Sequence, residues 1–443
     1  MYLHGTSKIN AQGHLEIGGV DTTDLKEQFG TPLYVVDEQL VRERCREYME
    51  AFRASGLGFQ VAYASKAFCV MAMCALAAEE GLSLDVVSDG ELFTALQAGF
   101  PAERIHFHGN NKTLEEIEMA LDAEIGCFVV DNFNELHLLQ AVAADKNRKV
   151  NILLRVTPGV EAHTHEYIST GQTDSKFGFD IGNGTAFEAI ELASKQSNLV
   201  LLGVHSHIGS QIFEVEGFQM AVQRVAEFAA NVYERLNVAF KVVNLGGGFG
   251  IRYIDGDTPL EVSQYVKAIT DAVKNHFAQI GYAVPEIWVE PGRSIVGEAG
   301  TTIYTVGTSK DIPGVRKYVA VDGGMTDNPR PALYESKYEA VLANRANEAA
   351  QETVSVAGKC CESGDMLIWD LDLPKVQSGD LLAVACTGAY NYSMASNYNR
   401  IRRPAVVFVK DGQGDVVVRR ETYQDIIQND LVPERIAKQP VTR

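Results

Sequence analysis

Residues 200–250 carry the clearest architectural signal in the sequence. They contain an apolar run VLLGVH (200–205), an amphipathic segment (218–236), a second apolar run KVVNL (241–245) and a glycine-rich loop GGGFG (246–250). The two apolar runs have the length and continuity of strands that are buried on both faces. The segment between them has the spacing of a helix that packs on one side. This order predicts a strand–helix–strand unit within a parallel sheet.

The same alternation extends in both directions from this unit. Strand-like runs lie at 61–65, 82–87, 104–107, 127–131, 150–156, 200–205, 241–245 and 286–289. Amphipathic segments separate them at 91–99, 114–123, 135–144, 186–194, 218–236 and 262–280, and Ser88-x-x-Glu91 has the pattern of a helix capping box. Eight such units in about 230 residues predict a closed (β/α)8 TIM barrel, with an open doubly wound sheet as the alternative.

The pattern changes after Ile295. Runs rich in Val, Ile, Thr and Tyr follow at 301–308, 317–321, 338–342, 353–357, 366–369, 380–386 and 405–409, and residues 410–415 form a predicted hairpin turn. We therefore predict an α/β barrel over residues 35–295 and a C-terminal antiparallel β domain over residues 296–443. An N-terminal segment, residues 1–34, is expected to pack with the β domain.

Composition excludes several classes of partner. The chain has 443 residues, 58 acidic and 39 basic side chains, and a formal charge of −19. This balance argues against binding to nucleic acid or to an anionic membrane surface. The seven cysteines form no CxxC pair, so we expect neither a disulfide framework nor a zinc site. With no signal-peptide pattern in residues 1–20 and no apolar run of about 18 residues, the expected compartment is the cytoplasm.

Polar residues follow every predicted barrel strand. In such barrels the chemistry lies at the carboxyl ends of the strands. The residues at these ends are Lys66, Asp85, Ser88, His108, Asn110, Asp131, Arg155, His205, His207, Ser210, the 246–250 glycine loop, Glu290 and Arg293. The long loop at 158–185 follows the fifth strand, and loops of this length in compact domains are often functional. We therefore predict an active site at this rim.

Taken singly, these residues allow more than one interpretation. Lys66 is either a desolvated, nucleophilic amine or a surface lysine. The glycine loop is either a tight turn or a phosphate cradle, and its place after strand seven favours the cradle. Glu290 needs a partner, either Arg155 or the protonated ring nitrogen of a cofactor. His207 could be a core histidine, a stacking group or, with His205, a metal ligand. Because no third ligand is evident, we expect no metal.

Taken together, the motifs resemble those of the fold-type III pyridoxal-phosphate decarboxylases. The matching motifs are Tyr63-Ala-Ser-Lys66, His205-Ser-His207-Ile-Gly-Ser-Gln211, Gly246-Gly-Gly-Phe-Gly250, Glu290-Pro-Gly-Arg293, Cys361-Glu362-Ser-Gly-Asp365 and Gly388-Ala-Tyr390. They occur in the family's order and cover nearly the whole chain. The resemblance implies a barrel with a β domain, pyridoxal 5'-phosphate as cofactor, and a homodimer whose active sites are shared between subunits.

The resemblance also implies a role for each matching residue. Lys66 would hold the cofactor covalently, His207 would stack on its ring, and Glu290 would keep the ring nitrogen protonated. The residues implied at the cofactor phosphate are Ser210, Gly246, Gly247, Gly248, Pro291, Gly292, Arg293 and Tyr390. Cys361 and Glu362 would enter the other subunit's site, with Cys361 as proton donor. The neighbouring Lys359-Cys360 departs from the family pattern and leaves open which cysteine donates.

Two motifs point to a substrate within the family. Arg330-Pro-Ala-Leu-Tyr334 and Tyr392–Tyr398 resemble the members that convert meso-2,6-diaminopimelate to L-lysine and CO₂, the last step of lysine biosynthesis. Arg330 and Arg293 could clamp the distal carboxylate, with Tyr334 and Tyr390 nearby, and Glu362 could take the distal ammonium. The alternatives are a decarboxylase for ornithine, arginine or carboxynorspermidine, and a non-enzymatic barrel protein that carries pyridoxal phosphate. The predicted β domain argues against the last.

Overall fold

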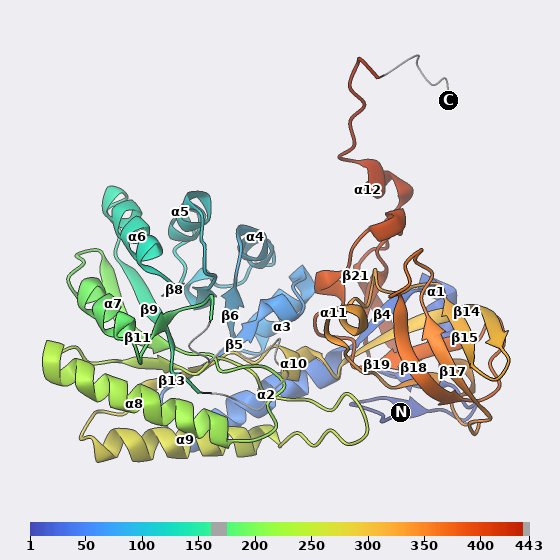
Figure 1. Cartoon of the computed structure of the whole chain (residues 1–443), viewed down its shortest axis with the longest axis horizontal. Helices are drawn as coiled ribbons and strands as arrows, with labels where there is room; N and C mark the ends of the chain where they lie inside the picture. Colours follow the sequence, from blue (N-terminus) through green and yellow to red (C-terminus); the bar gives the residue numbers. More distant parts are fainter. Residues whose placement is uncertain (161–174, 437–443) are drawn as a thin grey trace.

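The computed structural model describes residues 1–160 and 175–436, so half of the predicted loop at 158–185 lies outside the described residues (Figure 1). Eight parallel strands close into a barrel, because β13 pairs with β5. They are β5 (Phe59–Ala64), β6 (Ser83–Val86), β7 (Ile105–Phe107), β8 (Cys127–Val130), β9 (Val150–Thr157), β11 (Leu199–His205), β12 (Val242–Asn244) and β13 (Glu286–Val289), and the short β10 (Phe179–Asp180) adds to β9. The predicted barrel is confirmed.

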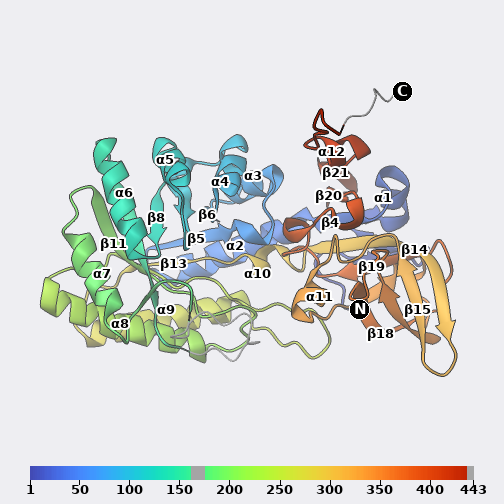
Figure 2. The ribbon, with the colours of Figure 1, turned by 45° about the horizontal axis from the view of Figure 1, so that its top comes forward.

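Helices cover the outside of the barrel (Figures 1 and 2). They are α2 (Glu38–Ser55), α3 (Met71–Glu79), α4 (Asp89–Gln97), α5 (Leu114–Asp122), α6 (Phe133–Asp145), α7 (Thr185–Ser194), α8 (Glu216–Leu236), α9 (Val262–Gln279) and the short α10 (Arg293–Val296). Sequence analysis missed α2 and α3. The sequence of α3, MAMCALAAE, is almost entirely apolar, so it lacks the polar stripe by which an amphipathic helix is recognised.

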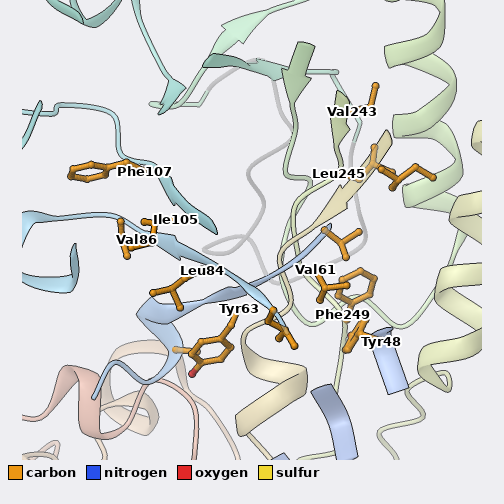
Figure 3. Packing of buried hydrophobic residues seen from close by; sticks show 14 of the residues in the cluster. Tyr48, Val61, Tyr63, Leu84, Val86, Ile105, Phe107, Val243, Leu245 and Phe249 are labelled. Carbon is orange, nitrogen blue, oxygen red and sulfur yellow. The ribbon is translucent and has the colours of Figure 1, made fainter. Parts of the chain in front are cut away.

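Apolar side chains fill the layer between the strands and this ring of helices. Figure 3 shows part of the layer: Val61, Leu84, Ile105 and Val243 come from β5, β6, β7 and β12, and Tyr48 of α2 belongs to the same cluster. Each is 1% exposed or less. Burial of a side chain of this size contributes about 1.5–3 kcal/mol, so the layer fixes the strand ends that carry the polar residues.

A mixed sheet forms the second domain. Its strands are β4 (Leu33–Asp37), β14 (Gly300–Ile312), β15 (Arg316–Val321), β16 (Ala340–Leu342), β17 (Glu352–Ala357), β18 (Met366–Leu373), β19 (Leu381–Ala385), β20 (Ala405–Lys410) and β21 (Gln413–Val418). The hairpin β20–β21 is confirmed. The sheet is not wholly antiparallel, because β15–β17 and β20–β4 pair in parallel.

The N-terminal segment contains a small sheet and a helix. These are β1 (Lys8–Ile9), β2 (Leu15–Ile17), β3 (Val20–Asp21) and α1 (Thr22–Phe29). The next strand, β4, pairs with β14 and β20, so the chain before the barrel lies in the β domain. The exact domain boundaries stay a prediction.

Short helices connect the strands of this domain. Residues Arg330–Tyr334 form the short helix α11, since Pro331 falls in its first turn, where proline is tolerated. The last helix is α12 (Tyr423–Ile427), and 3-10 turns lie at Ser65–Ala67, Ala102–Arg104, Ala343–Arg345, Tyr392–Met394 and Tyr398–Arg400. Within residues 1–160 and 175–436, no helix has the length and apolar character needed to cross a membrane.

Candidate active site

A cavity of about 410 Å³ lies at the carboxyl ends of the barrel strands. Most of the residues that sequence analysis placed at this rim meet in it. Its lining includes Lys66, Asp85, His108, Asn110, Arg155, His205, His207, Ser210, Gly247, Gly248, Glu290, Gly292, Arg293 and, from the β domain, Tyr390. Gly246 and Pro291 lie directly beside lining residues in the chain but do not line the cavity themselves.

Lys66 sits on the 3-10 turn Ser65–Ala67, directly after β5. Its side chain is exposed at the cavity, which agrees with the second of the two interpretations of this residue, an accessible lysine at the rim. The turn is anchored by the Ser65 hydroxyl, which donates to Glu91 Oε2 over 3.1 Å. Glu91 Oε2 also accepts the Val87 N–H over 2.7 Å, and the Ser88 hydroxyl accepts the Glu91 N–H. The predicted capping box is thus only half formed. The Ser88 hydroxyl accepts the Glu91 N–H, but the Glu91 carboxylate accepts the Val87 N–H and the Ser65 hydroxyl instead of the Ser88 N–H.

Glu290 is buried at the end of β13 and is held by three side chains. Asn244 Nδ2 donates to Oε1 over 2.6 Å, His108 Nε2 lies 3.0 Å from the same oxygen, and His205 Nε2 lies 3.1 Å from Oε2. Burial alone would raise the pKa of Glu290, but the two histidines outweigh it and hold the pKa well below its usual value. Arg155 is not its direct partner, since its nearest carboxylate is Asp131 at 4.0 Å. Glu290 is therefore a stable anion facing the cavity.

His207 is held as a neutral ring. Its Nδ1 accepts the backbone N–H of Gly247 over 3.2 Å. Burial, reinforced by the positive charge of Lys66, lowers its pKa well below the usual value. A neutral, oriented imidazole at the cavity wall offers a flat surface to a group bound in the cavity.

Three groups in the cavity have the arrangement of a possible metal site. Ligand atoms of His108, His205 and Glu290 all lie within 4.8 Å of one another. Sequence analysis paired His205 with His207 instead. The missed ligand, His108, comes from the loop after β7, and nothing in local spacing reveals which strands become neighbours across a barrel mouth.

The glycine loop approaches the backbone of neighbouring loops too closely for side chains. A Cβ on Gly247 would lie 2.2 Å from Glu290 O, and one on Gly248 would lie 2.4 Å from Gly209 O. Gly246 and Gly248 also have positive φ angles of 69° and 104°, which favour glycine. Bare backbone therefore borders the cavity on this side, as an anion cradle requires.

Arg293 supplies the positive charge next to this loop. It donates to Ser210 Oγ over 2.9 Å and to the Tyr253 hydroxyl over 2.6 Å, and its guanidinium lies 4.9 Å from the centre of the Tyr390 ring. Its Nε is buried and has no hydrogen-bond partner among the described residues. A cation with an unused donor beside bare glycines fits a phosphate or carboxylate.

Besides Gly246 and Pro291, four predicted site residues lie outside the cavity lining. Arg330 is buried behind it, donates to the Tyr338 hydroxyl over 2.7 Å, and stacks on Tyr253 at 5.0 Å from the ring centre. Because Arg293 bonds to the same Tyr253, the two arginines are connected through one ring. Tyr334 is exposed on α11, and Cys361 and Glu362 are exposed on the loop after β17.

Several residues of the site were not among those proposed from sequence. Asn244, Tyr253 and Phe177 contact the charged groups or line the cavity. Asp85, which was expected at the rim, also lines the cavity. Burial raises its pKa to about 6, and its Oδ1 lies 3.6 Å from His108 Nε2. Asn244 looks like any residue of a buried strand.

The fold and site together define a barrel enzyme in which an accessible lysine, a stabilised carboxylate and an anion cradle share one cavity. Residues 38–297 match the family described as "Pyridoxal-dependent decarboxylase, pyridoxal binding domain". The chain belongs to this family, and its cofactor is pyridoxal phosphate.

Full-length relatives agree with this assignment. The chain is 62% identical over 431 residues to diaminopimelate decarboxylase of Bacillus subtilis (strain 168), covering 97% of this chain and 98% of that one. It is 61% identical to diaminopimelate decarboxylase of Halalkalibacterium halodurans, with the same coverage. A crystal structure of diaminopimelate decarboxylase from M. jannaschii with L-lysine superposes with a TM-score of 0.92 at 38% identity, covering 97% of this chain and 99% of that one.

Proposed function

We propose that the chain removes CO₂ from meso-2,6-diaminopimelate to give L-lysine, as the last step of lysine biosynthesis. The observation that carries the proposal is the match over 97% of the chain, at 62% identity, to a diaminopimelate decarboxylase. The cavity supplies the chemistry that such a reaction needs. Pyridoxal phosphate, when bound, withdraws the electron pair that loss of CO₂ leaves on the substrate carbon.

The residues of the cavity fit this cofactor in kind and position. Lys66, exposed at the cavity, is the amine that would bind its aldehyde. Ionised Glu290 would favour a protonated ring nitrogen, and the neutral His207 ring would stack on the cofactor. Its phosphate would be held by Ser210, Gly246, Gly247, Gly248, Pro291, Gly292, Arg293 and Tyr390. These residues supply the bare glycine backbone and the Arg293 Nε that has no hydrogen-bond partner among the described residues.

Proton donation is assigned to Cys361 of a second subunit. Cys361 is exposed, and its backbone N–H donates to Asn399 Oδ1 over 2.7 Å, a contact that anchors the loop carrying the accessible thiol. Burial and the nearby Asp365 raise the pKa of Cys360 to about 11, and that thiol is partly buried. Access therefore favours Cys361 over Cys360. The same assignment requires a homodimer with shared active sites, and we place the enzyme in the cytoplasm.

Substrate choice is assigned to the charges around the far end of the cavity. The ring of Tyr253 joins Arg293 and Arg330, so two cations lie where a distal carboxylate could be clamped. Tyr334 and Tyr390 would border this end, and Glu362 of the second subunit would take the distal ammonium. Ornithine and arginine lack a second carboxylate, so they would leave this cation pair uncompensated.

A substrate panel tests the function. The purified protein with pyridoxal phosphate is given meso-diaminopimelate, ornithine, arginine and carboxynorspermidine, and released CO₂ and amine products are measured. We expect CO₂ and L-lysine in equal amounts from meso-diaminopimelate and little turnover of the others. Turnover of ornithine or arginine without turnover of diaminopimelate would reject the proposal. Cofactor binding without any turnover would favour the non-enzymatic carrier.

A further inference from the structure

Two imidazoles and one carboxylate converge on the wall of the cavity at the barrel rim. His108 directly follows β7, His205 ends β11 and Glu290 directly follows β13, and one ligand atom of each lies within 4.8 Å of the other two. All three residues line the cavity, although none is more than 7% exposed. This is the donor set of zinc sites in which three protein ligands leave a fourth position open. Here the open position would face the cavity.

The spacing of these atoms agrees with ligation of a single ion. Around a tetrahedral zinc ion with bonds of about 2.0–2.1 Å, neighbouring ligand atoms lie about 3.3 Å apart. His108 Nε2 is 3.0 Å from Glu290 Oε1, and His205 Nε2 is 3.1 Å from Glu290 Oε2. The carboxylate thus presents one oxygen to each imidazole, so an ion between the three groups would be within reach of all of them.

One of these contacts is close without being aligned as a hydrogen bond. His108 Nε2 is buried and has no hydrogen-bond partner among the described residues, although Glu290 Oε1 is 3.0 Å away. Asp85 Oδ1, which lies 3.6 Å from the same nitrogen, is also buried without a partner in this part of the chain. Nearly all buried polar atoms in folded proteins are paired. Close polar atoms that are not aimed at one another have the arrangement of ligands that share a third atom, so they indicate a bound cation independently of the spacing.

The charges around this wall also favour a divalent cation. Glu290 and Asp85 supply two buried carboxyl groups. Two cations share the cavity and oppose an added positive charge. Arg155 is balanced by Asp131, 4.0 Å away, and Lys66 is exposed, so water and salt screen its ammonium group. Because buried carboxylates need a compensating charge, a dication at this wall would compensate both.

His108 is held in place by its own backbone and by that of the next residue. Its N–H donates to Val86 O over 2.8 Å. The carbonyl of Gly109 accepts a bond from Lys112 Nζ over 2.9 Å, and Lys112 is in turn held by the buried Glu135 carboxylate over 2.6 Å. A buried ion pair thus fixes the loop that carries the ligand nitrogen, which is the preorganisation that a metal site needs.

We propose that the cofactor-free cavity binds one Zn²⁺ ion through His108, His205 and Glu290, and that Zn²⁺ and pyridoxal phosphate exclude each other. Imidazole ligands favour Zn²⁺ over Mg²⁺ and Ca²⁺, which take oxygen ligands. The exclusion follows because Glu290, which faces the cofactor ring nitrogen in the proposed function, does not support a protonated nitrogen while it coordinates a dication. The exclusion therefore rests on the proposed function, whereas the metal site does not.

Zinc binding is tested by calorimetry on the full-length chain from which the cofactor has been removed, with ZnCl₂ as the titrant. We expect one Zn²⁺ per chain, and at least tenfold weaker binding in His108→Ala and in Glu290→Gln. If His108→Ala does not fold, Glu290→Gln, which keeps the size of the side chain, decides. His207→Asn is the matched control, because His207 lies two residues after His205 but its Nδ1 accepts the Gly247 N–H. Absence of stoichiometric binding, unchanged affinity in a folded test variant, or a tenfold loss in the control would overturn the proposal.

Competition is tested by what the protein carries rather than by its activity. The cofactor-free chain is incubated with excess Zn²⁺ and pyridoxal phosphate together and gel-filtered, and the bound metal and cofactor are measured by elemental mass spectrometry and absorbance. We expect the two to add up to no more than one per chain, and a chain that carries one of each would overturn the proposal. Neither measurement uses turnover, so a protein that shows this competition but releases no CO₂ from meso-diaminopimelate would reject the proposed function alone.

Discussion

His205 Nε2 lies 3.1 Å from Glu290 Oε2, and this contact joins the ends of β11 and β13 beneath the cavity. His108 Nε2 lies 3.0 Å from the other carboxylate oxygen. The carboxylate is thus surrounded by donors while remaining on the cavity wall. This arrangement keeps the buried carboxylate of Glu290 ionised, whereas a glutamate buried in an apolar wall would be protonated.

Replacing Glu290 tests how much its negative charge contributes to turnover. We expect Glu290→Gln to lower kcat at least tenfold, about 1.4 kcal/mol in the barrier, because a neutral amide does not favour a protonated cofactor ring. Cofactor binding, measured by absorbance after gel filtration, should persist. Glu286→Gln is the control on the same strand, since Glu286 bonds to Trp288 and not to the cavity. An unaltered kcat in Glu290→Gln would show that the charge of Glu290 does not assist the reaction.

The close approach of Gly247 to Glu290 O gives a second prediction. The added methyl of Gly247→Ala would lie 2.2 Å from that oxygen, so the glycine loop must shift away from the cavity. We expect lower thermal stability and at least tenfold weaker binding of pyridoxal phosphate. Gly307→Ala is the control, because its Cβ would lie 3.7 Å from the nearest atom, Ala320 O. Equal cofactor affinity in the two variants would show that the loop does not form the cradle.

The two adjacent cysteines allow a matched test of proton donation. We expect Cys361→Ala to lower turnover at least tenfold with the cofactor retained, and Cys360→Ala to have a much smaller effect, because Cys360 is partly buried and its pKa is raised to about 11. The measurement is CO₂ release under saturating substrate. The reverse order of effects would assign the donor to Cys360. Mixing Lys66→Ala with Cys361→Ala subunits should restore activity if sites are shared.

Most of the fold was predictable because the barrel strands are continuous apolar runs whose ends carry polar residues. The failures have local causes. Helix α3 is apolar on nearly all sides, and α11 spans only Arg330–Tyr334, too few residues for a helical spacing to be recognised. The parallel pairs of the β domain, β15–β17 and β20–β4, join strands that are not consecutive in the chain. The apolar pattern of a strand does not show which other strand it pairs with.

The site was predictable only in part, for a related reason. Lys66, Glu290 and the glycine loop follow strands and could be placed at one rim. Their partners depend on which strands become neighbours, so Asn244 and His108 were not identified as the groups that hold Glu290. Likewise, the sequence placed Lys66 at the correct strand end but did not decide between a desolvated amine and an accessible one.

Chemical trapping at Lys66 is the most direct test of cofactor attachment. Borohydride treatment of the protein loaded with pyridoxal phosphate should add the cofactor's mass to the peptide that contains Lys66, as seen by mass spectrometry. Lys66→Ala should lose this label. Lys176→Ala should keep it, although Lys176 lies next to Phe177 at the cavity. Label on another lysine in the wild-type protein would contradict the assignment.

The final prediction concerns the pH dependence of stability. Asp327 is buried, and burial raises its pKa from 3.8 to about 7; it accepts bonds from the Tyr304 hydroxyl and the Gly324 N–H. Since the folded-state pKa is raised, the stabilising contribution is fully present below about pH 4 and is lost as the pH rises toward 7.

The slope of stability against pH, measured by denaturant unfolding between pH 4 and 8, therefore isolates this residue. We expect Asp327→Asn to be destabilised at pH 4, where the wild-type side chain is protonated in the folded state and little of its stabilising contribution has been lost. Relative to wild type it should then gain up to about 1.4 kcal/mol per pH unit as the pH rises to 7. Asp271→Asn, at an exposed position on α9, should run parallel to wild type. A parallel curve for Asp327→Asn as well would show that Asp327 is ionised in the folded protein throughout this range.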